Sequence, residues 1–188
     1  MAEHKIVDGT GNGYNAKVDK SNRLRTRAVT LSNEAFVNLE EGRAYSINVQ
    51  VTPSGSNVCV FYFKNLSTTE NVVFEQIGTY TAANQVLEIY LKDTGTPTSG
   101  TTVAPTNLNS NSSSVLASTI ESGNSIGGLA QGNLAYRIRV SADNSTNAFN
   151  FDQDIVVAPQ QTFTVYAGVS GSALELFFDC HAISVGAN

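Results

Sequence analysis

Alternation of apolar and polar residues is the feature that most limits how this chain can fold. In residues 44–51 every second residue is apolar, which places one face of an extended strand against a core: Tyr45, Ile47, Val49 and Val51. The segment 58–63 is apolar throughout, as is typical of a strand covered on both faces. With a turn at 53–56, the strands 44–51 and 57–64 are predicted to pair as a hairpin.

Similar patterns continue to the end of the chain. Further strands are predicted at 70–80, 85–92, 133–140, 154–158, 162–169 and 173–185. In the strand 133–140 three apolar residues are expected to point inward and two arginines outward: Tyr136, Ile138 and Val140, against Arg137 and Arg139. In 162–167 inward aromatic residues are expected opposite threonines. A short turn at 168–172 predicts that the last two strands also form a hairpin.

About eight or more strands, with turns at intervals of roughly 8–12 residues, are typical of an all-β sandwich. We predict an antiparallel β-sandwich of the jelly-roll kind, with a closed barrel as the alternative. Helical patterns are few. The segment 31–41 is expected to form a short helix capped by Ser32, and 113–121 fits a helix or a strand equally well.

Two segments fall outside this core. Residues 93–114 are rich in Thr, Ser, Gly, Asn and Pro, and we expect a long surface loop there. Residues 1–30 have glycines that interrupt regular structure, followed by extended patterns, and are interpreted as an N-terminal arm. The predicted organisation is therefore an arm (1–30) and a sandwich domain (31–188).

Composition limits the classes of function. Only 14% of the 188 residues are charged and the net charge is -5, so neutral polar groups coat the surface. This balance argues against binding nucleic acid and against attachment to anionic lipid. No apolar run predicts a transmembrane helix, and the first residues lack the apolar core of a secretion signal. Cys59 and Cys180 are expected to be buried thiols, with a disulfide as the alternative.

The glycine-rich segment 8–13 matches neither of two common phosphate-binding motifs, the GxGxxG motif of dinucleotide sites and the P-loop. A dinucleotide site needs a preceding strand, a following helix and a different third glycine, and no Gly-Lys-Ser/Thr is present for a P-loop. Calcium ligation by Asp8, Asn12 and Asp19 matches no EF-hand spacing. A flexible turn with positive φ is the favoured interpretation.

Three arginines alternate along the arm: Arg23, Arg25 and Arg27. On an extended strand they would project from one face. They indicate either a solvated strand edge protected by charge or a strip that docks on an acidic partner.

Few side chains suggest catalysis. In the tripeptide 179–181, Asp179 and His181 would share a face and Cys180 would point away, so a surface Asp–His pair is favoured over a Cys–His dyad. Asp152 and Asp154, with Asp143 near them, are candidates for a hydrolase or a calcium site but are more typical of turns. Three tyrosines could stack on sugars, although core packing is favoured: Tyr14, Tyr80 and Tyr90.

The N-terminal motifs carry a resemblance. They are Asp8-Gly9-Thr10-Gly11-x-Gly13, Ala16-Lys17-Val18-Asp19, Arg23-Leu24-x-x-Arg27-Ala28-Val29-Thr30 and, further along, Phe61-Tyr62-Phe63-Lys64-Asn65. Together they resemble small β-rich virion proteins of tailed bacteriophages, which are labelled as head-decoration, structural or fibre-like proteins. The motifs that carry the resemblance lie within the first 65 residues. The rest of the chain is similar only in its general β-rich character. It implies a virion component without catalysis, cofactor or metal, made in the host cytoplasm and displayed on the capsid surface.

By this analogy we expect the arm to attach the protein to the major capsid protein, and a homo-oligomer, in the simplest case a trimer. The expected contact residues are Asp8, Gly9, Gly11, Gly13, Lys17, Arg23, Arg25 and Arg27. The alternative is a fibre-like or receptor-binding module in which 93–114 and exposed tyrosines contact host glycans. A small hydrolase that uses Asp152, Asp154 or His181 is the third hypothesis.

Overall fold

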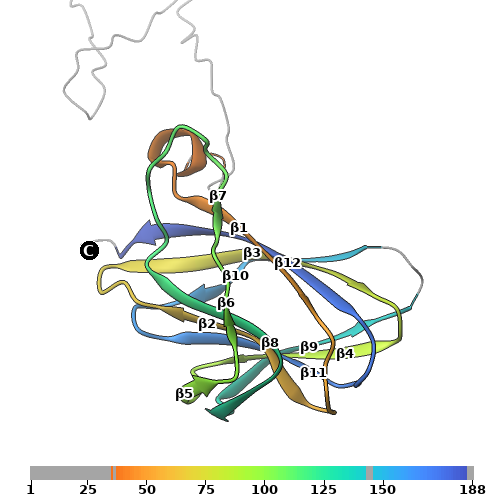
Figure 1. The fold of residues 1–188 in the computed structure, drawn as a ribbon. Coiled ribbons are helices and arrows are strands. Elements are labelled where there is room, and N and C mark those ends of the chain that lie inside the picture. Colours follow the sequence, from red (N-terminus) through yellow and green to blue (C-terminus); the bar gives the residue numbers. More distant parts are fainter. Residues whose placement is uncertain (1–34, 36, 143–145, 186–188) are drawn as a thin grey trace, which may run out of the picture. The chain divides into compact units, whose positions relative to one another are not determined.

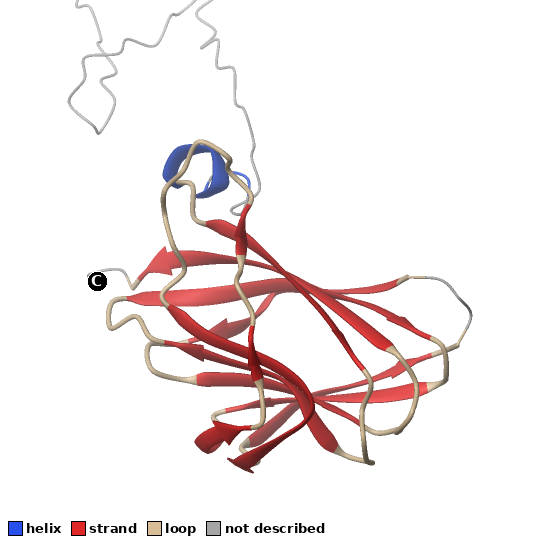
Figure 2. Ribbon diagram, viewed as in Figure 1, coloured by secondary structure: helices blue, strands red, loops and turns tan. Residues whose placement is uncertain are grey.

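The computed structural model describes residues 35, 37–142 and 146–185, and most of them lie in β-strands (Figures 1 and 2). Two sheets pack face to face, and every strand pair is antiparallel. This arrangement confirms the predicted all-β antiparallel sandwich.

The first sheet has five strands in the order β10 (Asn147–Val157), β3 (Glu70–Thr81), β12 (Leu174–Ser184), β1 (Ala44–Val51) and β7 (Thr106–Asn107). The second sheet has seven strands in the order β5 (Thr94–Thr98), β8 (Ser118–Ala130), β2 (Val58–Asn65), β11 (Thr162–Ala167), β4 (Gln85–Leu91) and β9 (Asn133–Val140), with β6 (Thr101–Thr102) beside β8.

Phenylalanines from both sheets form the centre of the core: Phe61, Phe63, Phe74, Phe163 and Phe178. The rings of Phe74 and Phe163 stack across the two sheets at 4.4 Å, and those of Phe61 and Phe178 do so at 4.3 Å. Such pairs add about 0.5–1.5 kcal/mol to the hydrophobic term. The described sandwich therefore has a closed core of its own.

Both predicted hairpins are wrong, although their strands exist. The predicted strands 44–51 and 57–64 correspond to β1 and β2, but β1 pairs with β12 and β7 while β2 pairs with β8 and β11. In the same way, β11 and β12 lie in different sheets. The short segments after β1 and after β11 cross from one sheet to the other. Alternation identifies the buried face of a strand and does not identify its partner.

The predicted surface loop 93–114 contains three short strands, β5, β6 and β7, each paired with a longer strand. Of the helix expected over 31–41, the structure describes Ala35, which is helical, and a π-helical turn, η1 (Val37–Glu41). The ambiguous segment 113–121 becomes β-strand from Ser118 onward.

Strand β9 is an edge strand of its sheet, and six of its eight residues are exposed. Ile138 and Val140 are buried and both arginines are exposed, as expected. Tyr136, expected inward, is 36% exposed and leans on the ring of Phe151 at 5.4 Å, because no further strand covers it.

The cysteines are both buried and free. Cys59 lies on β2, outside the main core, and Cys180 lies on β12 within it, which confirms the expected thiols.

Candidate functional site

The expected partner-binding residues of the arm all lie outside the described part of the chain: Asp8, Gly9, Gly11, Gly13, Lys17, Arg23, Arg25 and Arg27. The same holds for Tyr14 and Asp143. Asp152 and Asp154 fall in β10, but their side chains are not among those described. These predicted sites therefore remain predictions.

The expected surface pair of Asp179 and His181 is wrong. His181 is completely buried, and its Nδ1 lies 3.2 Å from Oε1 of Glu75 on the neighbouring strand β3. Asp179 instead accepts a hydrogen bond from Nε2 of Gln76. Burial lowers the pKa of His181 below its usual range, because the imidazolium form loses its hydration.

A β-bulge causes this arrangement. Asp179 pairs with Gln76, but the next residue, Cys180, pairs with Phe74, so that Glu75 is the extra residue in β3. A bulge redirects a side chain next to the irregularity, and here it accompanies the close approach of Glu75 to His181. The paired neighbours of His181, Ala44 and Val73, are also buried, so the imidazole sits in a covered part of the sheet.

A buried carboxylate, Asp93, was missed by the sequence reasoning. It lies between β4 and β5, directly before β5, and is only 5% exposed. Its Oδ2 accepts hydrogen bonds from the hydroxyls of Thr164 at 2.8 Å and Tyr166 at 3.0 Å, and its Oδ1 accepts one from the Gly132 amide at 2.9 Å. Thr162 donates its hydroxyl to the Asp93 carbonyl. Four donors thus hold Asp93 in place.

These hydroxyls come from one face of β11, the strand whose aromatics were expected to point inward. Phe163 does face the core, but Tyr166 lies on the opposite face with Thr164 and packs with Cys59, Tyr62 and Ile126. Burial, the Cys59 thiol and the Asp93 carboxylate all raise the pKa of Tyr166. Burial also raises the pKa of Cys59 to about 12, so its thiol stays protonated and unreactive at neutral pH. Asp93 and these partners, which we call the Asp93 cluster, hold the ends of neighbouring strands together. None of the side chains in the cluster is an activated nucleophile.

The candidate sugar-stacking tyrosines differ in position. Tyr90 packs its ring against Tyr166 at 5.2 Å and donates its hydroxyl to Glu88, so it belongs to the packing of the second sheet. Tyr80 is half-buried on β3, beside Glu175 of β12.

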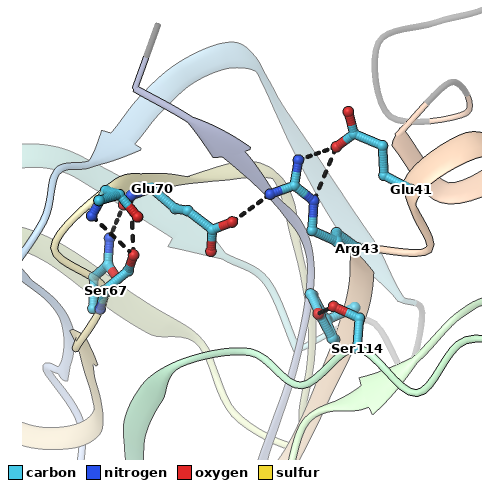
Figure 3. Close-up of polar contacts among 8 residues, drawn as sticks. Glu41, Arg43, Ser67, Glu70 and Ser114 are labelled. Atoms are coloured by element: carbon cyan, nitrogen blue, oxygen red, sulfur yellow. Dashed lines mark hydrogen bonds and ion pairs between the residues drawn. The ribbon is translucent and has the colours of Figure 1, made fainter. Parts of the chain in front are cut away.

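Ion pairs hold the segment that leads into β1 (Figure 3). Arg43, just before β1, contacts Glu41 at the end of η1 and Glu70 at the start of β3. Glu70 is itself held in place, because its amide donates to Ser67 and its carbonyl accepts from Asn65. Partial burial alone would lower the pKa of Arg43, but the two carboxylates raise it overall.

Side chains from 107–114 complete this junction. Asn107 and Ser112 donate to the Gly42 carbonyl at 2.8 and 2.9 Å, and Asn109 donates to the Asn38 carbonyl at 2.8 Å. A side chain at Gly42 would collide with Ser112, and its φ of +61° also favours glycine. We call Asn38, Gly42, Arg43 and their partners the junction. It ties η1 and the start of β1 to β3 and to the segment 107–114.

Within the described residues, no group of three or more His, Cys, Asp or Glu side chains is placed to hold a metal ion. No helix in the same part of the chain is long and apolar enough to cross a membrane.

No protein-family model, curated protein or solved structure matches this chain.

Proposed function

We propose that this protein is a structural component of a tailed-bacteriophage virion. In this role it decorates or cements the capsid by docking residues 1–30 on neighbouring subunits of the major capsid protein. The resemblance of its N-terminal motifs motivates the proposal. The junction is the structural observation that best supports it.

An attachment arm works only if the body that it tethers is rigid where the arm begins. The junction provides such a fixed starting point, since Arg43 bridges two carboxylates and three side chains hold the backbone of Asn38 and Gly42. Among the described residues, the main core cluster is formed by residues between Tyr45 and Ala182. We expect residues 1–30 to serve a partner.

Arm docking would use two kinds of contact. An extended segment can add to the edge of a neighbouring sheet through backbone hydrogen bonds. Arg23, Arg25 and Arg27 can pair with acidic groups of the capsid surface. A symmetric homo-oligomer, in the simplest case a trimer, would multiply weak single contacts into strong attachment.

Removal of residues 1–30 tests this function. We expect the truncated protein to fold, and to stop co-sedimenting with purified capsids that lack the protein. The triple variant Arg23→Ala, Arg25→Ala, Arg27→Ala should weaken co-sedimentation and make the remaining binding less sensitive to salt.

The matched control is Arg137→Ala with Arg139→Ala. These arginines also alternate along a strand, and Arg137 pairs with Glu88 in an exposed salt bridge of little energetic weight. The control should bind capsids like the wild type. Unchanged capsid binding after loss of 1–30 would reject the proposal.

A further inference from the structure

The outer face of the five-stranded sheet has a hollow of about 290 Å³ between β1 and β12. It is lined by Asn48, Val49, Gln50, Glu175, Leu176 and Phe177. The hollow lies on the sandwich itself, away from the buried Asp93 cluster and outside the core between the sheets.

Strand pairing brings the outward side chains of the hollow together. Asn48 is paired with Phe177 and Gln50 with Glu175. Asn48, Gln50 and Glu175 are exposed, and Gln50 donates a hydrogen bond of 3.3 Å to Glu175. The amides supply both donors and acceptors, and the carboxylate supplies acceptors. These groups can therefore bind several hydroxyls at once.

Phe177 lines the hollow from β12, and its ring reaches toward β3, on the other side of β12 from β1. It is paired with Gly78 of β3, and a Cβ atom built on that glycine would lie only 1.6 Å from the tip of the phenyl ring. The ring thus covers the backbone of Gly78. A side chain on any other residue at this position would displace the ring. Phe177 is half-buried, so part of its side chain is open to solvent beside the hollow. The glycine holds an aromatic surface close to the sheet.

This combination fits one class of ligand. A pyranose has an apolar C–H face that packs on an aromatic ring and a rim of hydroxyls that bind amides and carboxylates. A phosphate or nucleic acid is disfavoured, because Glu175 lines the hollow and no basic side chain does. An apolar segment is disfavoured by the polar rim, which it would leave without hydrogen bonds.

We propose that this hollow is a binding site for uncharged saccharides, with Phe177 as the stacking surface and Asn48, Gln50 and Glu175 as hydroxyl-binding groups. The site does not depend on capsid attachment. A virion protein with both properties would present the saccharide site on its body while its arm holds the particle.

The test uses the full chain and three neutral probes: maltopentaose, cellopentaose and chitopentaose. We expect at least one probe to show saturation-transfer NMR signals and to bind with a dissociation constant of about 1 mM or tighter. Phe177→Ala should weaken that binding by about tenfold or more. Gly78→Ala should weaken it as well, because the added methyl group displaces the ring.

Tyr136→Ala removes an exposed ring from the other sheet and is the matched control, which should bind like the wild type. Melting temperatures identify any variant that has lost its fold. The proposal is overturned if none of the probes binds at about 10 mM, or if a folded Phe177→Ala variant binds as well as the wild type. Co-sedimentation with capsids is a separate readout, so failure of one proposal does not decide the other.

Discussion

Asp93 shows how one side chain can hold strand ends together. Its carboxylate is buried, and two hydroxyls and a backbone amide donate hydrogen bonds to it. Hydrogen bonds to a charged acceptor are stronger than neutral ones. Removing the acceptor would leave these buried donors unsatisfied, at about 1–3 kcal/mol for each donor.

We therefore expect Asp93→Ala to lower the free energy of unfolding by about 3 kcal/mol or more. Asp93→Asn keeps the shape and one acceptor oxygen, so its cost should be smaller. Urea denaturation of both variants measures the difference. Equal stability of Asp93→Ala and the wild type would show that the cluster is not structurally important.

His181 predicts how stability depends on pH. Its pKa is lowered in the folded protein, so the unfolded chain binds a proton more readily. The stabilisation that neutral His181 contributes is fully present above pH 6.5, the ordinary histidine pKa that applies to the unfolded chain. It declines as the pH falls toward the lower pKa of His181 in the folded protein. The nearby Glu75 carboxylate would offset part of this loss.

The variant His181→Gln removes the titration. Between pH 7 and pH 5, unfolding free energies of the wild type should fall more steeply than those of the variant, by at most about 1.4 kcal/mol per pH unit. The comparison requires urea melts at each pH. Parallel profiles for the two proteins would contradict the buried neutral imidazole.

At the scale of elements, the strands were predictable and their partners were not. The spacing of Tyr45, Ile47 and Val49 identifies a strand with one buried face. Pairing depends on where the chain crosses between sheets, and no local pattern records this. Asp93 was missed for a related reason: within a polar segment it looks like a loop residue. The only local signal was the line of hydroxyls on β11, at Thr162, Thr164 and Tyr166.

Strand β5 depends on a close backbone crossing with β8. Gly95 has φ of +103°, and a Cβ atom there would lie 2.2 Å from the Gly128 carbonyl oxygen. We expect Gly95→Ala to destabilise the protein and to speed amide hydrogen exchange in β5. Gly171→Ala is the matched control, because Gly171 also has positive φ but nothing within 4 Å of the added methyl group.

The control should cost about 1 kcal/mol from backbone strain alone, and Gly95→Ala should cost more because it adds a collision with backbone. Equal losses of unfolding free energy in the two variants would show that β5 does not need this crossing.

At the scale of the whole molecule, the proposed function assigns different roles to the sandwich and to residues 1–30. The described core, the Asp93 cluster and the junction all stabilise the sandwich. The proposed attachment depends on residues 1–30, and the proposed saccharide site depends on β1 and β12. These parts can therefore be tested independently.

The most direct test of the central claim is amide hydrogen exchange of the full chain, measured free and on capsids that lack the protein. If the arm attaches the protein, amides of residues 1–30 become strongly protected on the capsid, while the strands of the sandwich exchange as they do in the free protein. Protection confined to the sandwich, with residues 1–30 unchanged, would contradict it.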